Sequence, residues 1–279
     1  MEFLNDGFVK QDEGLASILS PGALAALKDL AVTRGIGGGR GEESDDEEDE
    51  IDVNALISNV RGHFEMEKIG SKEEVTKYTF GEVTFSVRGV KQELGKTLDS
   101  TGLTVWRASE NLCNWMVENG DYFEGKTVCE LGAGLGLVSI LLAKLNVTEE
   151  PIICTDGDDI SINLLEDNIE RNDCEAKVIA QKLFWGEGHE AFIEEHPNID
   201  VIVAADVVYE EYHLEAILST VLAIFKSREA DDAASVKFIL SYARRHVALD
   251  TILDRFSENQ LQAEIVSGDV EPIIIISKL

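Results

Sequence analysis

The sequence is poor in basic residues and in long apolar runs, and each shortage argues against a class of protein. Lysine and arginine together number 24 against 54 aspartates and glutamates, which gives a formal net charge of −30. A field of that sign repels nucleic-acid phosphates and attracts basic partners, so we expect no binding to DNA or RNA. No stretch approaches ~18 consecutive apolar residues, so no membrane-spanning helix is predicted.

Cysteine is also scarce. Cys113, Cys129, Cys154 and Cys174 lie far apart and form no C-x-x-C pair, and two of them sit in apolar, strand-like runs. The first ten residues lack a basic leader followed by an apolar stretch, which argues against a secretory signal. These features favour a reducing compartment. We therefore expect a cytoplasmic protein, with the nucleus as an alternative.

The first fifty residues differ in composition from the rest. Residues 20–34 predict a short helix, with Ser20 as its N-cap. A glycine-rich hinge follows, and then eight of the nine residues 42–50 are aspartate or glutamate. Because such blocks stay solvated, we predict a flexible linker or tail at 1–50. A contact with a basic partner, or a phosphate on Ser44, is the sharper alternative.

Residues 51–124 are assigned to an extension that packs on the core. Within it, residues 77–90 alternate apolar and polar positions around Gly81, which predicts a β-hairpin. Residues 104–120 predict a helix that places Leu112, Trp115 and Met116 on one face.

The core is assigned to residues 125–279, where strand-like and helix-like segments alternate. Such alternation predicts an α/β fold, a Rossmann-like, mostly parallel sheet with helices on both faces. No helix separates the last two strands, so one of them is expected to be antiparallel. Seven strands are predicted, at 126–132, 151–156, 176–185, 199–206, 235–243, 261–268 and 271–279, with helices at 136–146, 158–172, 210–227 and 246–260.

A glycine turn, CELGAGLGLVSI at 129–140, joins the first of these strands to its helix. Glycines 132, 134 and 136 leave room for a sharp turn and for a ligand near the backbone. The dinucleotide pattern needs glycine at position 137, where this chain has leucine. Glu130 ends the strand, and its carboxylate suits a cationic or hydroxylated ligand better than a pyrophosphate, although it could instead cap local amides.

Asp156 ends the second strand, twenty residues past the last of these glycines. An acid at this place can accept hydrogen bonds from both hydroxyls of a ribose. Three aspartates crowd the segment, but an EF-hand counted from Asp156 would place Ser161 where glycine is needed and Asp167 where glutamate is needed. Asp158 and Asp159 are expected to serve the helix start. No H-E-x-x-H pattern occurs, and no metal site is predicted.

Five motifs occur in an order that resembles a known family. GLTVWRA (102–108), ELGAG (130–134), TDGD (155–158), LFWG (183–186) and AADVVY (204–209) resemble the seven-β-strand (class I) S-adenosylmethionine-dependent methyltransferases. More narrowly, they look like the protein-lysine methyltransferase branch with a D-x-x-Y signature. The resemblance covers roughly residues 75–279. It implies a protein substrate, such as a protein with a basic surface or a translation or chaperone factor. It also implies that S-adenosyl-L-homocysteine is formed from the cofactor as a product.

The resemblance also assigns cofactor-binding positions. The glycine turn would lie against the methionine portion of S-adenosyl-L-methionine, and an acid at the second strand end would hold the ribose. Trp185 and Ala205 would contact the adenosine, and Trp106 would line the cofactor from the helix before the sheet. These positions, with Glu130, are Gly132, Ala133, Gly134, Asp156, Trp185, Ala205 and Trp106. The bland alternative for both tryptophans is an ordinary core position.

Asp206 and Tyr209 are the predicted catalytic residues. Asp206 would orient the incoming ammonium, and Tyr209 would offer a ring to the lysine stem and a hydroxyl to the amine. Arg107 departs from several relatives, which carry an uncharged or acidic residue there. Methylation of a small amine or of a protein histidine is an alternative, as is a cofactor-binding interaction protein without catalysis. A monomer is the default expectation.

Overall fold

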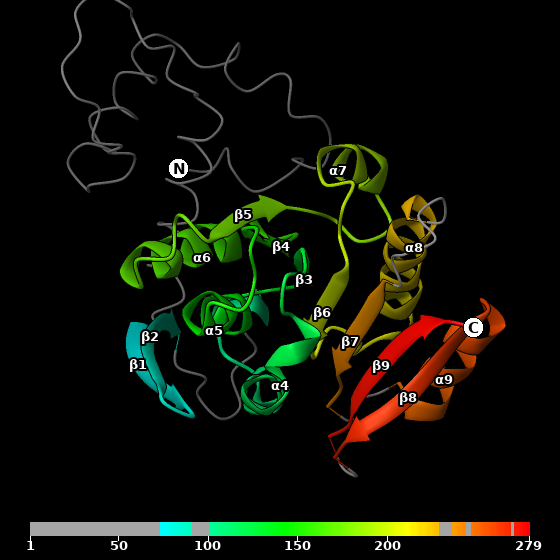
Figure 1. The fold of residues 1–279 in the computed structure, drawn as a ribbon, viewed down its shortest axis with the longest axis horizontal. Helices are drawn as coiled ribbons and strands as arrows, with labels where there is room; N and C mark the ends of the chain where they lie inside the picture. Colours follow the sequence, from blue (N-terminus) through cyan, green and yellow to red (C-terminus); the bar gives the residue numbers. More distant parts are fainter. Residues whose placement is uncertain (1–72, 91–100, 229–235, 244–246, 269–270) are drawn as a thin grey trace, which may run out of the picture. The chain divides into compact units, whose positions relative to one another are not determined.

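The computed structural model describes residues 73–90, 101–228, 236–243, 247–268 and 271–279 (Figure 1). All of these fall within one unit of the chain, residues 71–279. The helix predicted at 20–34 and the acidic block at 42–50, with Ser44, lie outside the described residues. None of the helices in the described ranges combines the length and the apolar character needed to cross a bilayer.

A seven-stranded sheet forms the centre of this unit, in the order β5-β4-β3-β6-β7-β9-β8. The first five strands in this order pair in parallel, and β9 is antiparallel to both of its neighbours. The predicted number of strands and the single antiparallel strand are therefore confirmed. The strands are β3 (Val128–Leu131), β4 (Ile152–Asp156), β5 (Val178–Lys182), β6 (Val201–Ala205), β7 (Lys237–Ser241), β8 (Leu261–Ser267) and β9 (Ile273–Lys278).

Helices cover both faces of the sheet because the central strands are apolar on both sides. Alternate strand residues, such as Cys129 and Leu131 of β3, join one buried cluster with side chains of α7, α8 and α9. The opposite face holds α5, whose Ser139 contacts Glu130 of β3. The helices are α4 (Arg107–Glu118), α5 (Leu137–Leu145), α6 (Asp159–Arg171), α7 (His189–Glu195), α8 (Glu211–Ser227) and α9 (Leu249–Glu258), with short 3-10 turns η1 (Thr101–Leu103) and η2 (Gly120–Tyr122).

Two element boundaries near the site differ from the prediction, and one helix was missed. Helix α4 begins at Arg107 because the preceding Trp106 has extended backbone angles. Strand β5 ends at Lys182, so Trp185 lies in the loop after the strand, just before a left-handed turn at Gly186 (φ +81°). The helix α7 was not predicted, since it has seven residues and only Phe192 among them is buried.

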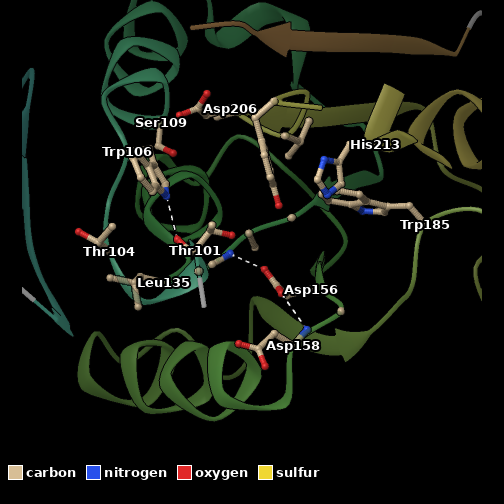
Figure 2. Close-up of a pocket in the computed structure, with 18 of the residues that line it drawn as sticks. Thr101, Thr104, Trp106, Ser109, Leu135, Asp156, Asp158, Trp185, Asp206 and His213 are labelled. Carbon is tan, nitrogen blue, oxygen red and sulfur yellow. Dashed lines mark hydrogen bonds between the residues drawn. The ribbon is translucent and has the colours of Figure 1, made fainter. Parts of the chain in front are cut away.

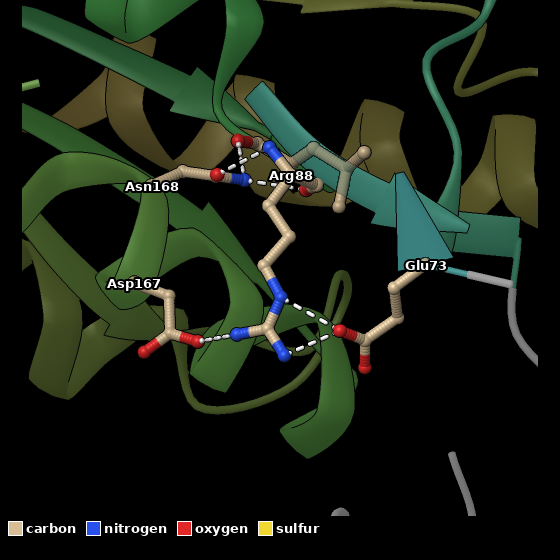
Figure 3. Close-up of polar contacts among 5 residues, drawn as sticks. Glu73, Arg88, Asp167 and Asn168 are labelled. Atoms are coloured by element: carbon tan, nitrogen blue, oxygen red, sulfur yellow. Dashed lines mark hydrogen bonds and ion pairs between the residues drawn. The ribbon is translucent and has the colours of Figure 1, made fainter. Parts of the chain in front are cut away.

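The predicted hairpin is confirmed as β1 (Glu73–Phe80) and β2 (Val83–Val90). Asn168 of α6 and the C-cap residue Asn172 form hydrogen bonds with β2 like those of a neighbouring strand. Asn168 accepts from the Arg88 amide at 2.7 Å and donates to the Arg88 carbonyl at 2.9 Å, and Asn172 pairs with Ser86 in the same way. Figure 3 shows the first pair, together with the Arg88 guanidinium between Glu73 and Asp167. Asn168 also donates to the Leu135 carbonyl, which ties the hairpin to the glycine turn.

Candidate active site

A cavity of about 610 Å³ opens at the carboxyl ends of β3, β4 and β6 (Figure 2). Its volume lies within the usual range for small-molecule sites, and the edge of an open α/β sheet is where such sites form. The structure brings nine of the ten predicted site residues to this one cavity. They are Trp106, Gly132, Ala133, Gly134, Asp156, Trp185, Ala205, Asp206 and Tyr209.

The glycine turn needs glycine for two reasons. Gly132 has φ +71°, a left-handed conformation that costs other residues roughly 1–2 kcal/mol. A Cβ on Gly132 would also lie 2.7 Å from Trp185 Cζ2 and from Val207 Cγ1, closer than carbon atoms approach. The backbone therefore passes directly under the indole of Trp185, and the cavity floor is bare peptide.

Asp156 uses some of its hydrogen-bond acceptor positions to bind this turn. One carboxylate oxygen accepts from the Gly134 amide at 2.9 Å, and the other accepts from the Asp158 amide at 3.0 Å. Each oxygen can accept a second hydrogen bond, so the group can take two hydroxyls of a ligand. Burial raises the pKa of Asp156, opposed by these two amides. Asp158 caps α6, as predicted, by accepting from the Ile160 amide and the Ser161 hydroxyl.

Glu130 is not part of the cavity, which corrects the expected position of this residue. Its side chain is only 3% exposed and points to α5, where it accepts from both the amide and the hydroxyl of Ser139. Burial raises its pKa to about 7. The reason is register: Glu130 pairs with Cys154, two residues behind Asp156 on β4, so it sits one pleat below the sheet edge.

Two tryptophans form opposite parts of the cavity wall. Trp106 donates its indole N–H to the Thr101 carbonyl at 2.8 Å, which fixes its ring on the α4 side (Figure 2). Trp185 lies on the other side, with its ring edge against His213 at a centroid distance of 6.0 Å. The Trp185 Nε1 atom is buried and has no hydrogen-bond partner within the described part of the chain. A buried donor of this kind costs free energy unless a ligand satisfies it.

The two predicted catalytic residues reach the same cavity from the loop after β6. Asp206 is 9% exposed and adopts φ +58°, and its amide donates to the Ser241 carbonyl at 3.0 Å. In Figure 2 it is seen beside Ser109, at the end of the view away from Asp158. Burial raises the pKa of Tyr209, opposed by the side chain of Thr101 in η1. Both residues line the cavity.

Several lining residues were missed by sequence reasoning. Thr101, Tyr212 and His213 line the cavity, and the imidazole lies 4.0 Å from the Tyr209 ring and 3.9 Å from the Tyr212 ring, centroid to centroid. Burial lowers the pKa of His213, opposed by Glu210. The only sequence signal for these residues was the run YEEYH at 209–213, which places three rings within five residues. Such residues often occur at a helix start without any function.

The charge of the lining is one-sided. Four carboxylates line the cavity, from Asp156, Asp158, Asp206 and Glu210, and no lysine or arginine among the described residues does. Such a wall disfavours phosphate groups and suits a ligand that carries positive charge. Among the described residues no group of three or more potential ligands is placed to hold a metal ion.

The sequence model of a family described as lysine methyltransferase matches residues 90–259 of the chain. A protein-lysine N-methyltransferase of Chaetomium thermophilum, EFM3, is 33% identical over 127 residues, which covers 43% of this chain and 38% of that protein. The calmodulin-lysine N-methyltransferase of Arabidopsis thaliana is 32% identical over 142 residues, 49% of this chain and 45% of that protein. The chain thus spans less than half of the length of these two relatives.

Among solved structures, a 16S rRNA methyltransferase of T. thermophilus, in complex with AdoMet and guanosine, aligns with a TM-score of 0.53. The alignment covers 75% of this chain and 51% of that chain at 18% identity. At this identity the likeness concerns the fold alone, and it agrees with the Rossmann-like sheet described above.

Proposed function

The chain belongs to the lysine methyltransferase family, and from this premise we propose that it transfers a methyl group from S-adenosyl-L-methionine to a lysine side chain of another protein. One observation carries the proposal: the glycine turn, Asp156, Asp206 and Tyr209 line a single cavity, where the Asp and Glu side chains meet no Lys or Arg within the described ranges. The relatives named above are protein-lysine and calmodulin-lysine N-methyltransferases, which supports a protein as the substrate.

The cavity suits S-adenosyl-L-methionine, which supplies the methyl group on a positively charged sulfonium. Asp156 has acceptor positions left for two ribose hydroxyls, and the unpartnered Trp185 Nε1 can donate to a ligand heteroatom. The bare peptide at Gly132 and Gly134 lets a ligand approach the backbone. The carboxylates, with no basic side chain among them, favour a cationic cofactor over a dinucleotide.

The protein's own residues must deliver the lysine as a neutral amine. A lysine with a pKa of ~10.4 costs about 4.6 kcal/mol to deprotonate at pH 7. Enclosure beside the Tyr209 ring lowers that pKa by desolvation, whereas the Asp206 carboxylate raises it. The role of Asp206 is therefore to orient the ammonium, whose proton passes to solvent before transfer. Packing of the Tyr209 ring on His213 supports the aromatic wall. Their contribution is chiefly alignment of the nitrogen with the methyl group, since the displacement itself needs little acid–base chemistry.

The test is methyl transfer from radiolabelled S-adenosyl-L-methionine, with the full chain and a cell extract as the source of substrate. We expect label on protein, and we expect the D206N variant to lose at least about 100-fold in rate while cofactor affinity stays within a few-fold. Asparagine is chosen because it tolerates the φ of +58° at this position better than alanine does. Label only in the small-molecule fraction, or full activity of D206N, would contradict the proposal.

A further inference from the structure

The mouth of the cavity carries exposed aromatic side chains. Six large hydrophobic side chains are exposed within the described residues, and two of them, Phe184 and Tyr212, line this cavity at 53% and 67% exposure. Large apolar groups on a folded surface are common singly, but two at one opening mark a place where another molecule packs. We call Phe184, Glu210 and Tyr212 the rim.

The rim is held in place before any partner arrives. The Tyr212 ring packs on the imidazole of His213, which packs in turn on Tyr209 inside the cavity. Phe184 lies against the backbone of Gly157. A Cβ atom added at Gly157 would lie 3.2 Å from Cδ1 of the Phe184 ring. Because these rings are already packed, little side-chain entropy remains to be lost when a partner binds them.

The charge of the rim is negative and largely uncompensated. Glu210 is exposed and has no ion-pair partner within the part of the chain that the structure describes. The nearby cation is Lys182, whose ammonium lies 5.1 Å from the centroid of the Phe184 ring. Lys182 is neutralised by its ion pair with Asp159. A ring that already attracts one cation, at a cavity that is also lined by the exposed Glu210 carboxylate, matches an arginine or lysine side chain.

We infer that the rim docks a basic segment of the substrate, with an arginine or lysine close in sequence to the lysine that enters the cavity. The inference rests on the proposed function and extends it from any protein lysine to lysines in basic surroundings. A guanidinium stacks on Tyr212 or Phe184 and pairs with Glu210, while acidic flanks are repelled by the same carboxylate.

The experiment measures binding of three fluorescein-labelled peptides to the full chain with S-adenosyl-L-homocysteine present. Each peptide has fifteen residues and a central lysine, flanked by arginines, serines or glutamates. We expect the arginine-flanked peptide to bind at least ten-fold more tightly than the glutamate-flanked one. The E210Q and Y212A variants should each weaken binding of the arginine-flanked peptide about three- to ten-fold, measured at a concentration of S-adenosyl-L-homocysteine that saturates each variant.

Matched controls separate docking at the rim from the general attraction of an acidic protein for a basic peptide. Glu264 and Ile265 of β8 are exposed and lie outside the cavity lining, so E264Q and I265A make the same kinds of change elsewhere. Equal affinity for the three peptides, no measurable binding of any, or equal losses in the control variants would overturn the inference. Failure to bind S-adenosyl-L-homocysteine at all would instead overturn the proposed function.

Discussion

Two neighbouring strands of the sheet each carry a carboxylate at their carboxyl end, and the two regions use it differently. Around Glu130, the side chain points into α5 and its Oε2 atom accepts from the amide and the hydroxyl of Ser139. Around Asp156, two residues further toward the edge in register, the carboxylate faces the cavity and keeps acceptor positions free. Position along the strand therefore decides whether an acid faces a neighbouring helix or the cavity.

The largest expected effect comes from removing the acid of the second region. In the D156A variant, S-adenosyl-L-methionine loses two charge-assisted hydrogen bonds, each worth about 1.5–3 kcal/mol. We expect affinity, measured by calorimetry, to fall at least about 100-fold. The E130Q variant should keep its affinity within a few-fold. Equal losses in both variants would remove the distinction between the two regions.

A second effect concerns pH and the first region. Glu130 has a pKa of about 7 in the folded chain against an ordinary 4.5, so its contribution to stability is fully present below pH 4.5. As pH rises from 4.5 to 7, the unfolded chain loses this proton and the folded chain keeps it, so the free energy of unfolding falls. Between pH 5 and 8 the wild type should lose roughly 2–3 kcal/mol more than E130Q, which has no proton to lose there.

Urea unfolding of both proteins at several pH values measures this difference. Asp156, whose pKa is also raised by burial, is present in both proteins, so its contribution cancels in the comparison. Parallel pH profiles for the wild type and E130Q would show that Glu130 is ionised in the folded chain at neutral pH, against the present account.

The smallest of the three effects tests the boundary between the regions. Gly132 follows Glu130 by two residues, and the G132A variant meets both a left-handed backbone and the Trp185 ring. We expect a loss of roughly 2 kcal/mol in the free energy of unfolding, with weaker cofactor binding because the indole must move. Gly188 offers a matched control, since it has φ +67° with nothing within 4 Å of an added Cβ. If G188A and G132A behave alike, backbone strain alone explains the loss and contact with Trp185 is irrelevant.

Much of the fold is predictable from the sequence because each central strand is a short apolar run bounded by polar residues. The absence of a helix between β8 and β9 was enough to predict an antiparallel strand. The helix α7 escaped because one buried residue in seven leaves no periodic signal. The strand that was expected to reach Trp185 ends at Lys182. The apolar run continues into the loop, where it forms part of the cavity wall and not of the sheet.

The candidate site was predictable to a similar extent. Motif order identified the glycine turn and the acid at 156, since both follow directly from where a strand ends. Glu130 was misplaced because a sequence does not show the register between strands. Tyr209 and Thr101 come together from segments that are distant in the chain. The stacking of Tyr209 on His213 involves residues without a recognisable sequence pattern. Such contacts depend on the packed structure.

The central claim, transfer of a methyl group to a protein lysine, is tested most directly by finding the atom that receives it. The full chain would be incubated with a cell extract and S-adenosyl-L-methionine carrying a deuterated methyl group, and labelled peptides would be sequenced by mass spectrometry. The account predicts deuterated methyl groups on lysine side chains, absent when D206N replaces the wild type. Deuterated methyl groups found only on histidine or on small molecules would contradict it.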